Sequence, residues 1–415
     1  MTMSTDDLYS EVLKKVEEYG QEHLLRFYDE LGPDGRERLL WSIKDADFSV
    51  LSRLDEGDSG ASRGKITPLT DVARISDIKR DRDVFYSEGA RAVKSGEVAA
   101  VLLAGGAGTR LGFDHAKGMY NIGITKDVYI FERIIANLRD VTDELGCVVP
   151  LFIMTSEKNN AETFAFFEEM NYFGYDRDHV KFFIQDMAPA CDYDGKIFLE
   201  EKDCVATSPN GNGGWFSSFV NSGLLDVAKA EGVKWLNVFA VDNVCQRIAD
   251  PLFVGATILS GAQAGAKVIA KAAPDEKVGV LCLEDGRPSI VEYYELTDEL
   301  MNAKDENGNP AYNFGVILNY LFDIDALLNV NSGKMPVHVV EKKIPHIDSV
   351  GNHIKPSEVC GYKFETLILD MVHLLDGCLA YEVVREREFA PIKNRTGIDS
   401  VESARKLLEL NGVKL

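Results

Sequence analysis

The sequence has no cluster of lysine and arginine residues that could match the polyanionic backbone of DNA or RNA. It carries 67 acidic residues against 45 basic ones, and its formal net charge is -22. Since nucleic-acid binding needs a basic face, we expect no nucleic-acid partner. An acidic protein can still bind a small polyanion by gathering a few cations in one cleft. The lysine and arginine residues that lie near glycine-rich segments are therefore of most interest.

Long apolar runs and paired cysteine spacings are also missing. No stretch approaches the ~20 apolar residues that span a bilayer, and the acidic N-terminus lacks the apolar core of a signal peptide. The seven cysteines are odd in number, and no two have Cys-x-x-Cys spacing, which argues against a disulfide framework and a zinc site. We expect a cytoplasmic protein with reduced thiols and no membrane partner.

Length and patterning predict more than one domain. The 415 residues are 45% apolar and 27% charged, as in ordinary globular proteins of two or three domains. Leucine and valine recur at helical spacing over residues 6–55, with Ser4 or Thr5 as the N-cap. Residues 56–65 (EGDSGASRGK) have the composition of a linker or exposed loop. We divide the chain into a mainly helical region, a catalytic α/β domain and a short closing segment: residues 1–95, 96–390 and 391–415.

The pattern after residue 95 alternates between strands and helices. Short apolar runs typical of buried parallel strands cover residues 98–106, 148–154, 180–184 and 233–241. Helical patterns lie between them or follow them, at residues 128–145, 161–170 and 215–231. This alternation predicts a doubly wound α/β sheet. Two Asp-Gly turns predict antiparallel hairpins, and the final stretch predicts a closing helix; these are Asp194-Gly195, Asp285-Gly286 and residues 400–410.

The first predicted strand ends in a glycine-rich loop, Gly105 to Gly112. Glycine lets backbone N–H groups converge on an anion without a Cβ in the way. The loop lacks the Gly-Lys-Ser/Thr of a Walker A motif, and Leu111 stands where a dinucleotide fingerprint needs its third glycine. What distinguishes it is Arg110 inside the loop and Lys117 just after it. The alternative interpretation is a tight strand-to-helix turn with a surface arginine.

Two further segments could complete a phosphate site. The strand at 233–241 is followed by Asp242, a hard oxygen ligand suited to Mg²⁺ and placed where open α/β sheets bind ligands. Taken alone, Asp242 could equally cap a turn. Residues 208–214 (SPNGNGG) precede a helical pattern and could offer N–H groups, or form a plain loop.

The loop sequence LAGGAGTRLGFDHAKGMYNIG, residues 103–123, resembles the signature of eukaryotic-type UDP-N-acetylhexosamine pyrophosphorylases. The resemblance continues in order along nearly the whole chain, through QEHLLRF (21–27), IMTS (153–156), DGKIFLEEK (194–202), PNGNGG (209–214), VDN (241–243), GAKV (265–268), VEY (291–293), KKIPHID (342–348), YEVVREREFAP (381–391) and KN (393–394). It implies a nucleotidyltransferase-type, Rossmann-like mixed sheet with an N-terminal helical region and a truncated C-terminal region.

The resemblance also implies an activity, namely the formation of UDP-N-acetylglucosamine and pyrophosphate from UTP and N-acetylglucosamine 1-phosphate. Mg²⁺, with Mn²⁺ as an alternative ion, would be held by Asp242. The residues implied in UTP binding are Leu103, Ala104, Gly105, Gly106, Arg110, Lys117, Gln185, Gly211, Asp242 and Lys363. Those implied around the sugar phosphate are Asn212, Glu292, Tyr293, Asn313 and Lys393. Arg110, Lys117, Lys363 and Lys393 would supply the catalytic charge.

Two departures from the family pattern leave alternatives open. The family's Asn-x-Gly-Asn stretch reads Asn313-Phe314-Gly315-Val316 here, so a side-chain amide that could bind the sugar is replaced by an apolar side chain. The β-rich C-terminal domain of larger members is expected to be absent, which leaves a monomer or a weak homodimer. The remaining alternatives are N-acetylgalactosamine, glucose or galactose 1-phosphate as substrate, a non-catalytic nucleotide-sugar binding protein, and a dinucleotide-dependent oxidoreductase, which the glycine spacing disfavours.

Overall fold

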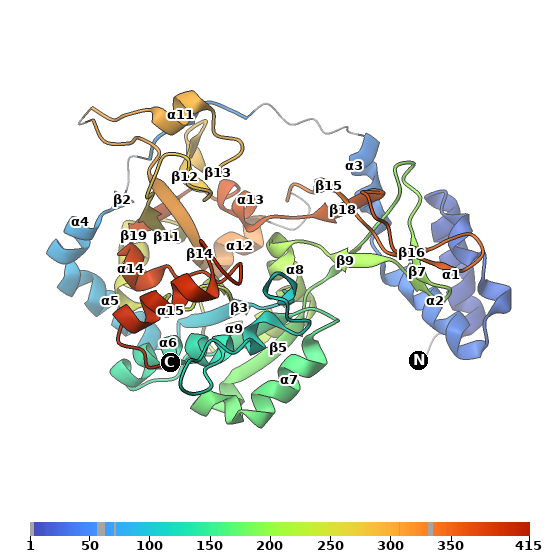
Figure 1. The fold of residues 1–415 in the computed structure, drawn as a ribbon, viewed down its shortest axis with the longest axis horizontal. Helices are drawn as coiled ribbons and strands as arrows, with labels where there is room; N and C mark the ends of the chain where they lie inside the picture. The colour runs from blue at the N-terminus through green and yellow to red at the C-terminus, as the bar shows by residue number, and fades with distance from the viewer. Residues whose placement is uncertain (1–3, 56–62, 70–71, 307, 331–334) are drawn as a thin grey trace. The chain divides into compact units, whose positions relative to one another are not determined.

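The computed structural model describes residues 4–55, 63–69, 72–306, 308–330 and 335–415 (Figure 1). The chain divides into two compact units, each built from separate segments. Unit 1 contains residues 1–62, 186–214 and 336–368, and unit 2 contains residues 63–185, 215–335 and 369–415. These units describe compactness, whereas the division at residues 95 and 390 concerns function and stays a prediction.

Unit 2 is built around one mixed sheet. Within the described residues the sheet has eleven strands. Its continuous path runs β2 (Val72–Ala73), β19 (Cys378–Glu382), β11 (Ala264–Ala270), β14 (Phe314–Asp323), β10 (Trp235–Ala240), β3 (Val98–Leu103), β4 (Leu151–Thr155) and β5 (Val180–Ile184). The strands predicted from the apolar runs are β3, β4, β5 and β10, and they pair in parallel as expected. The mixed α/β fold class is therefore confirmed.

The strand directions bring many chain segments to one edge of the sheet. β14 is antiparallel to both β10 and β11, so it begins where those strands end, and Phe314 pairs with Ala270, the last residue of β11. A hairpin of β12 (Val280–Glu284) and β13 (Arg287–Val291) attaches to the start of β14, and β1 (Ile66–Thr67) pairs with β12. The last residue of β13 therefore lies at this edge as well. Ligands of open α/β sheets bind at this carboxyl edge.

Helices pack against the sheet because each has one apolar stripe. α6 (Ile130–Leu145) buries Ile134, Leu138 and Val141 in the same core cluster as β3 and β4, and it ends at Gly146 in the left-handed conformation. α7 (Asn160–Glu169), α8 (Trp215–Asn221), α9 (Leu224–Ala230) and α15 (Val401–Leu410) also lie where helices were predicted. Ser400 caps α15 through its side chain.

Glycine allows one helix pair to approach unusually closely. α5 (Arg82–Lys94) and α10 (Pro251–Ser260) meet at Gly89 and Gly255. A Cβ on Gly89 would lie 1.7 Å from the carbonyl oxygen of Pro251, so no larger residue fits without moving the backbone. The charged α4 (Ile75–Arg80) precedes α5, and neither helix was predicted.

Unit 1 has a separate apolar core. α1 (Thr5–Glu18) and α2 (Pro33–Asp45) bury Val12, Leu39 and Leu40 in one cluster with Leu199 and Val205. The helical N-terminal region is therefore confirmed, and Ser4 is the N-cap of α1. The unit also contains short antiparallel pairs: β6 (Met187–Pro189) with β9 (Thr207–Pro209), β7 (Leu199–Glu201) with β8 (Cys204–Val205), β15 (His338–Lys342) with β18 (Gly361–Glu365), and β16 (His346–Ile347) with β17 (His353–Ile354).

The two Asp-Gly turns differ in outcome. Asp285 and Gly286 both adopt positive φ, as a two-residue turn between antiparallel strands requires, and they join β12 to β13 directly. Around Asp194-Gly195 the pairing is reduced to an isolated bridge between Cys191 and Ile197. The predicted linker begins at residue 56, and residues 56–62 lie outside the described part of the chain.

All seven cysteines are free thiols in the structure. Among the described residues, no helix is both long enough and apolar enough to cross a bilayer.

Candidate functional site

The glycine-rich loop after β3 is closed by its own backbone. The N–H of Gly108 donates to the carbonyl of His115 (2.9 Å), and the N–H of Lys117 donates to the carbonyl of Gly106 (3.1 Å). These bonds turn the chain back so that Lys117 lies beside the glycines. Within the described residues, the N–H groups of Gly106, Ala107 and Thr109 donate to no protein acceptor. The loop therefore offers free N–H groups beside a lysine, as an anion cradle requires.

Side chains from other elements hold this loop in shape. Glu162 on α7 accepts from the N–H of Ala116 (2.7 Å) through one carboxylate oxygen and contacts Nδ1 of His115 (2.9 Å) through the other. The amide of Asn159 donates to the carbonyl of Ala104 (3.2 Å). Both ends of the loop are thus fixed before any ligand binds.

Gln185 lies against the loop from the end of β5. Its side chain is buried, and its Oε1 would be 3.0 Å from a Cβ placed on Gly105. The backbone N–H of Gln185 donates to Thr155 at the end of β4 (2.8 Å). Leu103 and Ala104 complete the inner wall as the buried end of β3. Four of the residues predicted to contact uridine therefore lie together, at the ends of two strands.

Asp242 follows β10 directly beside the loop. The N–H of Val241 donates to the carbonyl of Leu103 (3.2 Å), which continues the pairing of β10 with β3. Nζ of Lys117 is 4.0 Å from Oδ2 of Asp242, and these side chains are 16% and 23% exposed. Burial lowers the pKa of Lys117 below its usual value, the charges of Arg110 and Lys393 lower that pKa further, and Asp242 opposes the shift. The structure thus brings Arg110, Lys393 and Asp242 close to Lys117.

A buried amide fixes the segment that carries Lys393. Asn243 donates from Nδ2 to the carbonyl of Glu388 (2.7 Å) and accepts at Oδ1 from the N–H of Ala390 (2.9 Å). The N–H of Ile392 then donates to the carbonyl of Asp242 (2.9 Å). Residues 388–392 are therefore laid along residues 242–244, and Lys393 follows at once. Its ammonium forms a 3.1 Å ion pair with Asp399.

An ion pair in the protein interior supports this junction. Lys267 on β11 is fully buried, and its Nζ lies 2.5 Å from Oε2 of Glu388 and 3.5 Å from Oδ2 of Asp250. The same Glu388 oxygen accepts from the N–H of Arg247 (3.2 Å). Burial raises the pKa of Glu388, and Lys267 opposes that shift. Removing one charge of such a pair would leave the other buried without a partner, which costs about 3–5 kcal/mol.

Four of the five residues predicted to surround the sugar phosphate lie in unit 2, and all except Asn212 are at this edge. Glu292 and Tyr293 follow β13, and Asn313 precedes β14 and accepts from the N–H of Lys271 (3.2 Å). A Cβ on Gly279 would be 3.5 Å from Cγ2 of Val316 and 3.7 Å from the carboxyl carbon of Glu292. Val316 and Glu292 are therefore neighbours. Burial and the charge of Glu295 raise the pKa of Glu292, while Lys393 and Arg63 lower it.

The remaining predicted residues belong to unit 1. Gly211 has a φ of 86°, and a Cβ there would lie 2.2 Å from the carbonyl of Thr366. Asn212 accepts from the N–H of Ile368 at its side-chain oxygen (3.1 Å). Lys363 is on β18, in the strand that leads to these partners. Gly211, Asn212 and Lys363 thus come from two segments that the fold of unit 1 brings together, and glycine is required at position 211.

The donor set around Asp242 fits a cation that shares its ligands with phosphates. Among the described residues, no group of three or more His, Cys, Asp or Glu side chains could hold a metal by itself. Asp242 is one partly exposed carboxylate beside free N–H groups of the loop. Mg²⁺ is commonly bound by one or two carboxylates together with substrate phosphates and water. Asp242 is suited to that kind of site.

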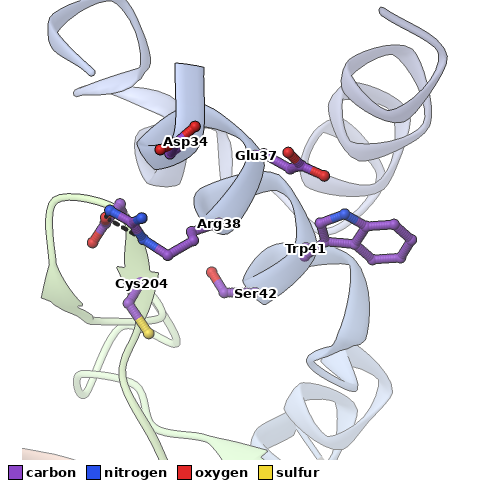
Figure 2. A pocket seen from close by; sticks show the side chains of 7 residues that line it. Asp34, Glu37, Arg38, Trp41, Ser42 and Cys204 are labelled. Atoms are coloured by element: carbon purple, nitrogen blue, oxygen red, sulfur yellow. Dashed lines mark hydrogen bonds and ion pairs between the residues drawn. The ribbon is translucent and has the colours of Figure 1, made fainter. Parts of the chain in front are cut away.

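Unit 1 also has a pocket of 630 Å³, shown in Figure 2, between α2 and the segment around β8. Arg38 and Asp203, which form an ion pair, line it together with Trp41 and Cys204. No residue of the predicted site lines this pocket.

Several residues of the site were not singled out from the sequence. Glu162 had no signal, because a glutamate on a helix is ordinarily a solvated residue. Asn243, Lys267 and Glu388 lie in the segments VDN, GAKV and YEVVREREFAP, which carried the resemblance without an assigned role. In the structure, these three segments meet at one buried junction, where Glu388 contacts both Asn243 and Lys267.

Free N–H groups, two loop cations and a carboxylate at the carboxyl edge of the sheet are typical of an α/β protein that binds phosphates. The comparison with known proteins is more specific. Residues 61–411 match the family described as UTP–glucose-1-phosphate uridylyltransferase. The chain belongs to this family.

Two relatives and one solved structure show how similar the chain is to individual proteins. The mouse UDP-N-acetylhexosamine pyrophosphorylase-like protein 1 is 37% identical over 410 residues, which is 94% of this chain and 81% of the mouse protein. The Saccharomyces cerevisiae UDP-N-acetylglucosamine pyrophosphorylase is 36% identical over 84% of this chain and 75% of its own length. The crystal structure of the Trypanosoma brucei UDP-N-acetylglucosamine pyrophosphorylase with an inhibitor is similar at a TM-score of 0.84 and 25% identity, over 98% of this chain and 85% of that one.

The lowered pKa of Lys117 predicts an alkaline limit to anion binding. The Lys117 ammonium is charged below its pKa, so it contributes fully to the affinity for inorganic tripolyphosphate at neutral pH. This affinity falls as the pH rises through a pKa that lies below the ordinary lysine value of 10.5. Calorimetric titration over a pH series measures this decline. In Lys117→Arg the decline moves to higher pH, because guanidinium stays charged. Wild-type affinity that stays constant up to pH 10.5 would contradict the prediction.

Proposed function

We propose that this protein is a uridylyltransferase that makes UDP-N-acetylglucosamine and pyrophosphate from UTP and N-acetylglucosamine 1-phosphate. The observation that carries the proposal is the grouping of Arg110, Lys393 and Asp242 around Lys117 at the carboxyl edge of the sheet. The protein as a whole has a net charge of -22. Three cations within one small region of such a protein are suited to binding two anionic reactants together.

The reaction itself needs no protein nucleophile. A phosphate oxygen of the sugar 1-phosphate forms a bond to the α-phosphorus of UTP, while the bond from that phosphorus to the bridging oxygen breaks and pyrophosphate leaves with the electron pair. Both reactants are anions, and their repulsion is strong where water is excluded. The protein's contribution is to align the two groups and to neutralise their charge.

The residues at the carboxyl edge divide this work. Gln185 and the segment Leu103–Gly106 hold the uridine, and the free N–H groups of the loop, with Arg110 and Lys117, hold the triphosphate. Lys393 binds the phosphate of the sugar. Asp242 would hold Mg²⁺, or Mn²⁺ in its place, and the ion supplies further positive charge when bound. Gly211 and Lys363 are proposed to contact UTP, and Asn212 the sugar.

The identity of the sugar rests on the relatives and on the residues near Glu292. Glu292 and Tyr293 are proposed to bind the sugar hydroxyls, and Asn313 lies at the same edge. Val316 favours a second candidate, namely uridylyl transfer to a sugar without the acetamido group, because an apolar side chain there cannot hydrogen-bond an amide. We further propose that the protein is cytoplasmic, that it acts as a monomer or weak homodimer, and that it has no nucleic-acid or membrane partner.

A panel of sugar 1-phosphates tests the proposed function. With UTP and Mg²⁺, we expect pyrophosphate release to be fastest with N-acetylglucosamine 1-phosphate among this sugar, N-acetylgalactosamine, glucose and galactose 1-phosphates. Val316→Asn restores the family's amide and should increase the preference for the acetylated sugars. A preference for glucose 1-phosphate would establish the second candidate, and no release with any member would indicate a binding protein.

Arg110→Ala should leave the fold intact and reduce turnover. Arg110 is exposed on the loop, and no ion pair of its side chain with another described residue would be lost. Removal of one aligned charge donor costs roughly 10²–10³ in kcat. Pyrophosphate release gives the rate, and circular dichroism compares the folds. Turnover near the wild-type rate would show that the loop does not bind the triphosphate.

Asp242→Asn should weaken the response to Mg²⁺. The amide is a poorer ligand than the carboxylate, so turnover falls and the Mg²⁺ concentration for half-maximal rate rises by more than about tenfold, the scale seen when groups that only orient a metal ligand are removed. Asp376→Asn, at an exposed position, is the control. If the variant and the wild type titrate alike, Asp242 is not the metal ligand.

A further inference from the structure

Arg63 is the first described residue after position 62, in the stretch whose composition predicted a linker. Its guanidinium contacts two carboxylates of the β12–β13 region. Nη2 is 2.7 Å from Oε2 of Glu295, and Nη1 is 3.0 Å from Oε2 of Glu284. Further donations reach the hydroxyl of Ser289 (3.3 Å) and the carbonyl of Ile290 (3.4 Å). Arg63 therefore makes several contacts to one region, unlike a solvated loop residue.

One of these contacts continues to the proposed sugar site. The Glu295 oxygen that pairs with Arg63 also accepts from the backbone N–H of Glu292 (2.9 Å). The N–H of Glu295 in turn donates to the carbonyl of Glu292 (2.9 Å). The turn at residues 292–295 is therefore closed on itself through Glu295, and Glu295 is held by Arg63.

Arg63 is itself fixed by the backbone that follows it. The N–H of Gly64 donates to Oε1 of Glu284 (2.8 Å), and the N–H of Lys65 donates to Oδ1 of Asp285 (2.9 Å). β1 then pairs with β12. Most exposed ion pairs contribute little because ordering two long side chains costs entropy. Here the Arg63 side chain is only 32% exposed and its backbone is already ordered by bonds independent of Glu295.

Charge gives Arg63 a second effect on the same turn. Glu284, Glu292 and Glu295 are carboxylates of one small region, and Arg63 is the cation that pairs with two of them. Without it, Glu295 would have a repulsive neighbour in Glu292 and no guanidinium to hold it in place. The Glu295 carboxylate would then be held near the N–H of Glu292 by the backbone of the turn and no longer by a guanidinium.

We propose that Arg63 is a positioning residue for the sugar pocket, acting through Glu295 to hold Glu292 and Tyr293 in the conformation that receives the sugar 1-phosphate. The inference rests on the proposed function, in which Glu292 contacts the sugar. It adds a residue that does not itself touch the substrate and that lies far from the glycine-rich loop in the sequence. The nucleotide residues around Gly105 share none of its contacts, so its effect is confined to the second substrate.

Arg63→Ala tests this role through the KM values of the two substrates. A charge-assisted hydrogen bond contributes enough that its loss raises the KM for the sugar 1-phosphate about ten- to one-hundredfold, while the KM for UTP stays unchanged. Arg63→Lys keeps the positive charge but lacks the two nitrogens that pair with Glu284 and Glu295, so it gives an intermediate KM for the sugar 1-phosphate. Arg287→Ala removes the exposed ion pair between Arg287, on the same hairpin, and Asp376, and leaves both KM values unchanged.

Glu295→Ala breaks the same connection from the other side. It should reproduce the Arg63→Ala effect, and the double variant should be no worse than either single one. Equal rises in both KM values, or no rise for the sugar 1-phosphate, would overturn the inference. Glu292→Gln distinguishes a failure of the positioning role from a failure of the proposed sugar site. If it changes the sugar KM and Arg63→Ala does not, the positioning role is wrong. If Glu292→Gln has no effect, the proposed sugar site is wrong.

Discussion

The side chain of Asn243 binds the segment 388–392 through one donor and one acceptor, and the placement of the site's charges depends on these two bonds. Asp242 precedes Asn243 and Lys393 follows Ile392, so the same backbone pairing brings together the two segments that carry these charged residues. The buried Lys267–Glu388 pair lies behind this junction. An amide can satisfy a donor and an acceptor at once, which apolar packing cannot. Lys393 is thereby held at a defined position near Lys117, although the two ammonium groups repel each other.

The lysines near the site fall into two kinds: those whose charge is neutralised within the protein and those whose charge can meet a ligand. Lys267 is paired with carboxylates in the interior and is unavailable to a ligand. Among the described residues, the ion-pair partner of Lys117 is the distant Asp242, and burial together with two nearby cations makes its charge costly. A bound polyphosphate would relieve that cost. In an acidic protein, a local excess of positive charge of this kind is what distinguishes the site from the rest of the surface.

Much of this could be predicted from the sequence, and the limits have physical causes. Fully buried parallel strands such as β3 and β10 read as continuous apolar runs, so the sheet and the loop at its edge were predicted. β14 was missed because a left-handed residue, Leu318, and an irregular register opposite β11 interrupt its pattern. Arg63 was interpreted as part of a linker because its neighbours are small and polar. Its contacts are to residues more than two hundred positions away, and no local pattern records them.

The order of residues along the chain has a consequence for how the site is assembled. During synthesis the glycine-rich loop, β4 and α7 are made early. The segment 388–392, which hydrogen-bonds to Asn243, is made near the end. Until residues 388–393 dock, the chain has a preformed anion cradle but lacks Lys393 and the backbone partner of Asp242. The loop and the residue proposed to hold the sugar phosphate therefore come from segments that are synthesised far apart in time.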